Sequence, residues 1–333
     1  MPSSSAARSQ GCRRSARSLA LALGLVAALP AAAEVSPYPS RAVKVVVAVS
    51  PGGTPDLLAR LLSARLSERT RQQFIVENRL GAGGNIAAEA VAKAPADGYT
   101  LFFPSSAVLT LNPAVYTRPG FDPVKDFAPI AIVGSGGYYF LACARLPVKS
   151  MQDLVALAKT RPVTYATAGH GTSHHLAGEM LNRAAGIRMV HVPYKGFAQG
   201  IQDVLGCKVD VIVGAVAGSA AYVKSGRVKA LAVTSQKRFP GTPEVPTMIE
   251  SGFPGFEVEA WYGLLATAGT PREVVERLNA ETLAVIRQKA FVDLLRDQGL
   301  EVVGGTPEAF SSRLRTELAS SAQLVKSLGL KVD

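Results

Sequence analysis

The sequence lacks the patterns on which several common activities depend. It has three cysteines and four histidines in 333 residues, and it contains neither a Cys-x2-Cys nor a His-Glu-x-x-His pattern, so no recognised zinc motif is present. The phosphate-binding pattern Gly-x4-Gly-Lys-Ser/Thr and the nucleophile pattern Gly-x-Ser-x-Gly are missing too. No dense Lys/Arg run is interleaved with aromatics, as nucleic-acid binding would favour. We therefore expect no catalysis, no cofactor, no metal and no nucleic acid.

Long apolar runs are also scarce. Beyond residue 33 no stretch is long and apolar enough to cross a membrane, and the run Leu19–Leu29 falls short of the ~20 residues that a span needs. Four arginines and no acid lie in residues 1–33, which end in Ala31-Ala32-Ala33. This order is typical of a secretory signal. It predicts cleavage near Ala33 and a periplasmic location, by either the general or the twin-arginine export route.

Charge and cysteines constrain the remainder only weakly. Removing residues 1–33 takes away four arginines and no acid, so the formal net charge falls from +11 to +7. Such a surplus suits an anionic ligand or an anionic membrane surface. Cys143 and Cys207 remain, and an oxidising compartment would allow them to pair. The sequence does not place them near each other, and we expect two separate small buried side chains.

Short β-branched runs alternate with amphipathic helical runs through most of the chain. Strands are predicted at 43–49, 74–77, 99–103, 128–133, 138–142, 163–167, 189–192, 209–213 and 228–234, and helices at 55–69, 87–93, 151–159, 174–184, 198–205 and 220–225. This alternation predicts an α/β fold of mainly parallel sheets flanked by helices. From Pro271 to Leu328 the pattern is almost entirely helical, apart from a short extended piece near Leu300–Val303.

Two segments look like crossings between two such sheets, one around Tyr138–Leu146 and one around Phe256–Leu265. If the chain leaves one sheet at the first and returns at the second, residues 142–258 form an inserted second lobe. Residues 34–141 and 259–333 then form the first lobe. Two crossover segments between two lobes make a hinge, which permits closure around a ligand.

Three loops are candidates for binding. In Ser50–Asp56, after the first strand, Gly52 and Gly53 let backbone N–H groups approach a ligand, and Thr54 is expected to cap the following helix. A helix start of this kind favours a carboxylate or phosphate, although a plain strand-to-helix turn has the same pattern. In the second loop, Ser105 and Ser106 either donate to an anion or cap a turn.

The third loop runs from Thr167 to His175 and offers Gly171 and Thr172 before another helix. Its similarity to the first loop predicts that an anion is held from two sides. The histidines His170, His174, His175 and His191 raise the possibility of a metal site, which we disfavour because no ligand set is completed around them. The glycine cluster Gly81–Asn85 is interpreted as a tight turn rather than a nucleotide site.

Several ordered motifs resemble one known family. They are Tyr38-Pro39-Ser40-Arg41, Pro51-Gly52-Gly53 with Asp56 and Ala59-Arg60, Glu77-Asn78-Arg79 with Gly81-Ala82-Gly83-Gly84-Asn85, Asp97-Gly98-Tyr99-Thr100-Leu101, Asn112-Pro113, Asp122-Pro123 with Lys125-Asp126-Phe127, Gly171-Thr172 with His175-Leu176-Ala177-Gly178-Glu179, Val192-Pro193-Tyr194-Lys195-Gly196, Leu231-Ala232-Val233-Thr234, Val245-Pro246-Thr247, Trp261 with Gly263, and Gly269-Thr270-Pro271. The chain after residue 33 resembles the Bug family, the extracytoplasmic solute receptors of tripartite tricarboxylate transporters. Two residues depart from the family pattern: Ser50 stands where proline is common, and Cys207 where a glycine is usual.

The resemblance implies a two-lobed periplasmic binding fold in which backbone, hydroxyl and water donors hold a ligand carboxylate. Carried over position by position, the first-lobe contacts fall on Gly52, Gly53 and Thr54 with Ser105 and Ser106, and the second-lobe contacts on Gly171 and Thr172 with Gly214 and Ala215. The ligand is left open among dicarboxylates, acidic amino acids, citrate-like acids and aromatic carboxylates.

The function expected from the sequence is capture of a small organic carboxylate by a monomer that delivers it to the membrane components of a tripartite tricarboxylate transporter. One alternative is a sensing receptor for a membrane signalling protein. The other is an α/β enzyme, which the scarcity of acids, lysine and arginine in the three loops disfavours.

Overall fold

The computed structural model describes residues 38–329, so the predicted signal segment 1–33 lies outside the described residues. The first βα units follow the predicted order: β1 (Val43–Val47), α1 (Thr54–Thr70), β2 (Phe74–Asn78), the short 3₁₀ helix η1 (Ala82–Gly84), α2 (Asn85–Ala92) and β3 (Thr100–Phe102). Two short helices that the sequence did not predict follow, α3 (Ser106–Thr110) and α4 (Asn112–Val115). β1 pairs in parallel with both β2 and β3. The glycine cluster forms the predicted tight turn, with Gly81, Gly83 and Gly84 at positive φ.

The middle of the chain repeats this arrangement. It contains α5 (Met151–Thr160), β5 (Thr164–Thr167), α6 (Ser173–Ala185), β6 (Val190–Pro193), α7 (Phe197–Leu205), β7 (Val211–Ala215), α8 (Val216–Lys224) and β8 (Val228–Val233). β5 pairs in parallel with β6 and with β7. Both parallel groups therefore contain strands joined through helices, as the alternation predicts.

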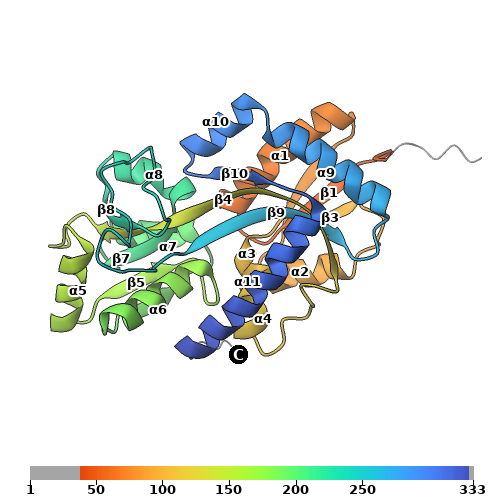
Figure 1. The fold of residues 1–333 in the computed structure, drawn as a ribbon. Coiled ribbons are helices and arrows are strands. Elements are labelled where there is room, and N and C mark those ends of the chain that lie inside the picture. The colour runs from red at the N-terminus through yellow and green to blue at the C-terminus, as the bar shows by residue number, and fades with distance from the viewer. Residues whose placement is uncertain (1–37, 330–333) are drawn as a thin grey trace, which may run out of the picture. The chain divides into compact units, whose positions relative to one another are not determined.

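One long strand takes part in both groups. β4 (Phe127–Cys143) has 17 residues and covers two segments that the sequence predicted as separate strands. Residues 127–137 pair antiparallel with β9 (Glu259–Thr267), and residues 138–143 pair antiparallel with β7 and β8. These antiparallel pairs make the ten-stranded sheet mixed (Figure 1). The lobe boundaries at residues 142 and 258 stay a prediction.

Glycines keep β4 continuous where the sequence pattern seemed to break. A β-carbon at Gly134 would lie 3.0 Å from the Glu301 carbonyl oxygen, and one at Gly136 would lie 3.0 Å from the Gly299 carbonyl oxygen. The strand β10 (Glu301–Gly304) pairs antiparallel with β4 at this point. Glycine is thus required here for close packing of backbone on backbone, and it does not end the strand.

The last part of the chain is helical, as predicted. It comprises α9 (Arg272–Ile286), α10 (Lys289–Asp297), the short β10, and α11 (Pro307–Leu328). α11 packs on β4, α3 and α4 (Figure 1). Trp261 of β9 packs edge-on against Phe310 of α11, with ring centroids 4.9 Å apart, and its Nε1 donates to Glu317 at 2.6 Å. Among residues 38–329, no helix combines the length and apolarity needed to span a bilayer.

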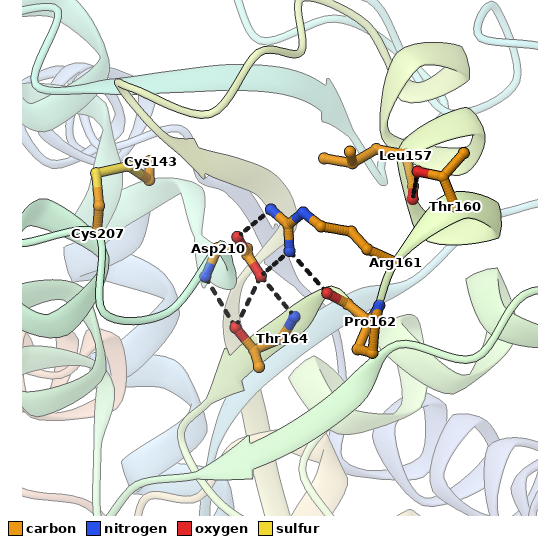
Figure 2. A network of polar contacts seen from close by, with 8 residues as sticks. All are labelled: Cys143, Leu157, Thr160, Arg161, Pro162, Thr164, Cys207 and Asp210. Atoms are coloured by element: carbon orange, nitrogen blue, oxygen red, sulfur yellow. Dashed lines mark hydrogen bonds and ion pairs between the residues drawn. A yellow bond between two sulfur atoms is a disulfide. The ribbon is translucent and has the colours of Figure 1, made fainter.

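The expectation of two separate cysteines was wrong. Cys143 and Cys207 form a disulfide, with their α-carbons 5.4 Å apart (Figure 2). The pairing of β4 with β7 brings them together, because the Cys143 N–H donates to the Asp210 carbonyl at 2.9 Å. Cys207 has a φ of 56°, a left-handed conformation that favours glycine, which accounts for the glycine usual at this position.

Asp210 stabilises the region beside this disulfide. Its carboxylate accepts from Arg161 Nη2 at 2.7 Å and from the Thr164 N–H at 2.9 Å (Figure 2). Burial acts to raise the pKa of Asp210, but the hydrogen bonds from Arg161 and Thr164 outweigh it and lower the pKa. The carboxylate is therefore charged at neutral pH and ties the start of β5 to the start of β7.

Candidate ligand-binding site

The first predicted loop is held by its own polar groups. Gly53, and not Thr54 as predicted, is the N-cap of α1, and its carbonyl accepts from the Leu57 N–H at 3.0 Å. The Gly52 N–H donates to Asp56 Oδ2 at 2.9 Å, and the Gly53 N–H donates to the Ser50 carbonyl at 3.2 Å. These two N–H groups therefore shape the loop, and Thr54 becomes the first residue of the helix.

The carboxylate of Asp56 holds this loop in place. Its side chain is almost fully buried and also accepts from Arg60 Nε at 3.1 Å and from Asn78 Nδ2 at 2.8 Å. Burial acts to raise the pKa of Asp56, but the hydrogen bonds from Arg60, Gly52 and Asn78 together lower it. A charged carboxylate thus connects the loop, α1 and the end of β2.

Two buried tyrosines lie where the predicted loops meet. Tyr262 of β9 forms an isolated antiparallel bridge with Ser105 of the second loop, and the side chains of Thr54 and Tyr138 lie near enough to its phenol to affect its pKa. Tyr138 of β4 packs edge-on against His174 of the third loop, and Ser173 beside it affects the pKa of Tyr138. Residues of the first, second and third predicted loops therefore lie around this tyrosine pair.

The tyrosine pair is neutral. Burial is the main cause that raises the pKa of Tyr138 to about 12, while the nearby Ser173 and Tyr262 side chains partly oppose this shift. Burial, followed by the proximity of Tyr138, raises the pKa of Tyr262 well above its usual value. Both phenols stay protonated at neutral pH, so each is a hydrogen-bond donor that carries no charge.

The third loop approaches α4. Thr172 caps α6, because its Oγ1 accepts from the His175 N–H at 3.3 Å, and it also donates to the Gly169 carbonyl at 2.8 Å. Gly171 has a φ of +71°, and a β-carbon there would lie 3.2 Å from the ring of Tyr116. Glycine therefore lets this loop contact the segment that follows α4.

A second close approach involves the first loop. A β-carbon at Gly196, in the turn between β6 and α7, would lie 2.8 Å from Ser50 Oγ in the first loop. Ser50 is one of the two departures from the family pattern, and it faces a turn that glycine keeps open. The loop after β1 thus lies against the turn after β6.

The other predicted residues differ in their contacts. Ala215 pairs with Tyr138 across β4 and β7, whereas Gly214 packs under Phe197, whose ring a β-carbon would meet at 2.5 Å. Ser106 is buried, and its carbonyl accepts from Thr110 Oγ1. Two surface hollows of about 540 and 390 Å³ lie elsewhere, and none of the nine predicted residues lines either of them.

The structure adds residues that the sequence analysis missed. Tyr138, Tyr262 and Ser173 were not among the predicted contacts, although Tyr138 begins a predicted crossing and Trp261 beside Tyr262 was noted in a motif. The available signal was a tyrosine in a strand predicted to be buried at a crossing. A buried phenol hydroxyl needs a hydrogen-bond partner, which points to a polar site.

Three histidines also come together. Ring nitrogens of His170, His175 and His191 all lie within 4.8 Å of one another. His174 lies apart from them and packs edge-on against Tyr138, with ring centroids 4.6 Å apart. Three of the four histidines considered in the sequence thus come together, and the fourth does not.

Comparison with known proteins identifies the family. Residues 58–330 match the model of TctC, described as the tripartite tricarboxylate transporter family receptor. The chain belongs to this family. A curated relative, Protein BugT of Bordetella pertussis, is 32% identical over 309 residues, covering 92% of this chain and 95% of BugT. The resemblance to Bug receptors seen in the motifs is thereby confirmed.

Solved structures of the family share the fold. Rpa4515 of R. palustris with adipate is 36% identical, with a TM-score of 0.85 over 88% of this chain and 99% of that protein. MatC of Rhodopseudomonas palustris with bound malate is 31% identical, with a TM-score of 0.82 over 86% of this chain and all of that protein. The predicted periplasmic binding protein fold is therefore confirmed.

Proposed function

We propose that this protein is an extracytoplasmic receptor that holds a small organic carboxylate at the Tyr138–Tyr262 pair. The observation that carries the proposal is the placement of two buried phenols among the predicted loops: Tyr262 is bridged to Ser105, and Tyr138 pairs with Ala215 and packs on His174. The hydroxyls of Thr54 and Ser173 lie near these phenols. Adipate and malate in two relatives support a carboxylate as the class of ligand. The membrane components of a tripartite tricarboxylate transporter are the proposed recipients, because the family is named for them.

The chemistry of the site suits binding and release. Each of the four hydroxyls can donate to a carboxylate oxygen, and none of them brings a full charge. A buried ion pair requires two charged groups to leave water, whereas neutral donors avoid the desolvation of the second charge. Arg60 lies near the first loop but is committed to Asp56. We therefore propose a receptor without turnover.

Closure of the two lobes is part of the proposal. β4 and β9 are the strands that would bend, with residues 34–141 and 259–333 forming one lobe and residues 142–258 the other. A ligand that contacts Thr54 and Ser173 at once favours the closed arrangement through those extra contacts. Cleavage near Ala33, a periplasmic location and a monomeric state complete the proposal.

A panel of carboxylates screened by thermal unfolding tests it. A true ligand present at a hundred times its Kd should stabilise the protein by ~2.7 kcal/mol. Stabilisation by a phosphate ester or a nucleotide but by no carboxylate would overturn the proposal, as would conversion of the bound carboxylate to a product.

Phenylalanine variants test the site itself. Because a hydrogen bond to a charged group contributes about 1.5–3 kcal/mol, Tyr138→Phe and Tyr262→Phe should each weaken carboxylate binding about tenfold to a hundredfold. The matched control is Tyr222→Phe on α8, where the phenol lies beside Arg227. Unchanged affinity in both site variants would show that the ligand binds elsewhere.

A further inference from the structure

Three of the four histidines in the sequence gather at one end of α6. His170 is exposed in the loop before the helix, His175 is buried in the first turn, and His191 lies half-buried on the neighbouring strand β6. These side chains come from two segments that pair through β5 and β6. The binding site proposed above does not use them.

We propose that His170, His175 and His191 form a binding site for a late first-row divalent cation, with Zn²⁺ as the reference ion. Imidazole nitrogen is a preferred ligand of such ions, and three of them are enough for a Zn²⁺ site that keeps a fourth position open for water or an anion. A site of this kind adds to the proposed carboxylate binding and does not depend on it.

The metal-free geometry requires a small adjustment. Tetrahedral Zn–N bonds of about 2.05 Å place ligand nitrogens roughly 3.3 Å apart, whereas here they lie within 4.8 Å. The rings of His175 and His191 are stacked, with centroids 4.0 Å apart and planes at 12°. One ring must therefore rotate to direct its lone pair at a shared ion.

His191 is the ring expected to rotate. Its Nε2 shares a hydrogen bond of 2.7 Å with Thr167 Oγ1, and coordination would exchange that bond for the metal. His175 is buried in the first turn of the capped helix α6 and has less room to move. Its Nδ1 accepts a long hydrogen bond of 3.4 Å from the Gly171 N–H, which coordination through this nitrogen would replace. His170 is exposed, so it can move toward the other two at little cost.

A carboxylate lies on the same helix as His175. Glu179 follows His175 by four residues on α6, so the two side chains share one face of the helix. The negative charge of Glu179 there would offset part of the charge of a bound cation.

Nuclear magnetic resonance of the ring nitrogens gives a direct test, since only four histidines contribute signals. Histidine-labelled protein, prepared without a polyhistidine tag, is titrated with Zn²⁺ alone. We expect the ring signals of His170, His175 and His191 to shift together at one equivalent, while those of His174 stay in place. Shifts confined to His170, or none at all, would overturn the proposal.

Affinity measurements provide the second test. Loss of an outer-shell partner alone weakens metal binding about 10- to 100-fold, so His170→Ala and His191→Ala should weaken Zn²⁺ binding at least that much. His170 is exposed, and its replacement should not affect folding. Arg188→Ala, an exposed neighbour before β6, is the control and should bind as the wild type does. Equal affinity in all three variants would refute the site, and because no carboxylate is used, this result leaves the proposed function untouched.

Discussion

Removing the Cys143–Cys207 bridge is predicted to cost a large part of the stability. The bridge closes a segment with a sequence separation of 64, and the chain-entropy model assigns about 4 kcal/mol of unfolding free energy to a loop of that length. Replacing both residues by alanine should therefore lower the free energy of unfolding by about that amount. Alanine at position 207 would still have to adopt the left-handed conformation observed for Cys207.

A glycine at position 207 separates the two contributions. Because a residue with a β-carbon loses roughly 1–2 kcal/mol in the left-handed region, the Cys143→Ala, Cys207→Gly double variant should be more stable than the double alanine variant by that margin.

The assay is urea unfolding followed by far-ultraviolet circular dichroism, with the reduced and oxidised wild type measured beside both variants. The urea concentration at the unfolding midpoint should be highest for the oxidised wild type, lower for the glycine variant and lowest for the alanine variant. If reduction changes the free energy of unfolding of the wild type by less than about 1 kcal/mol, the entropic account of this bridge is wrong. If the two variants have the same unfolding midpoint, the left-handed conformation of residue 207 has no effect on stability.

Three further predictions concern the loops and the histidines. Gly171→Ala should lose more stability and more carboxylate affinity than Gly186→Ala, because both glycines have positive φ but only Gly171 contacts Tyr116; equal losses would show that the contact is irrelevant. Asp56→Asn should cost about 1–3 kcal/mol in urea unfolding, and because the folded pKa of Asp56 is lowered, its contribution is present above the unfolded pKa and should fade as pH falls through the folded one. Since His174 and His175 have folded pKa values of about 4, the unfolded chain takes up protons first, and the melting temperature should fall as pH drops from about 6.5 to about 4; a flat profile there would contradict the burial of these rings.

Much of the fold was predictable because it depends on local patterns. Each βα unit is recognisable in the sequence as a β-branched run followed by an amphipathic run, and the helical tail after Pro271 lacks this alternation. The junction within β4 was not predictable in this way. Gly134 and Gly136 look like strand breakers, and only their contact with the backbone of residues 299–301 explains why the strand continues.

The site was predictable only in part. Strand ends followed by glycine and hydroxyl residues indicated loops that make close approaches, but the partners were not predicted: Gly171 approaches Tyr116, and Ser50 approaches Gly196. The sequence analysis took the Gly52 and Gly53 N–H groups as donors to a ligand, whereas in the structure they donate to groups of their own loop and of α1. Tyr138 and Tyr262 are far apart in sequence, and so are Cys143 and Cys207. Their contacts arise from strand pairing, which no single segment encodes.

The position of Trp261 gives the protein an optical reporter. It is the single tryptophan of the sequence and directly precedes Tyr262, but neighbouring residues in a strand point to opposite faces. Its indole faces Phe310 and Glu317 of α11. Fluorescence emission from Trp261 therefore depends on the packing of α11 against β9. A change in its wavelength or intensity on ligand addition would show that binding on one face of the strand alters the packing on the other.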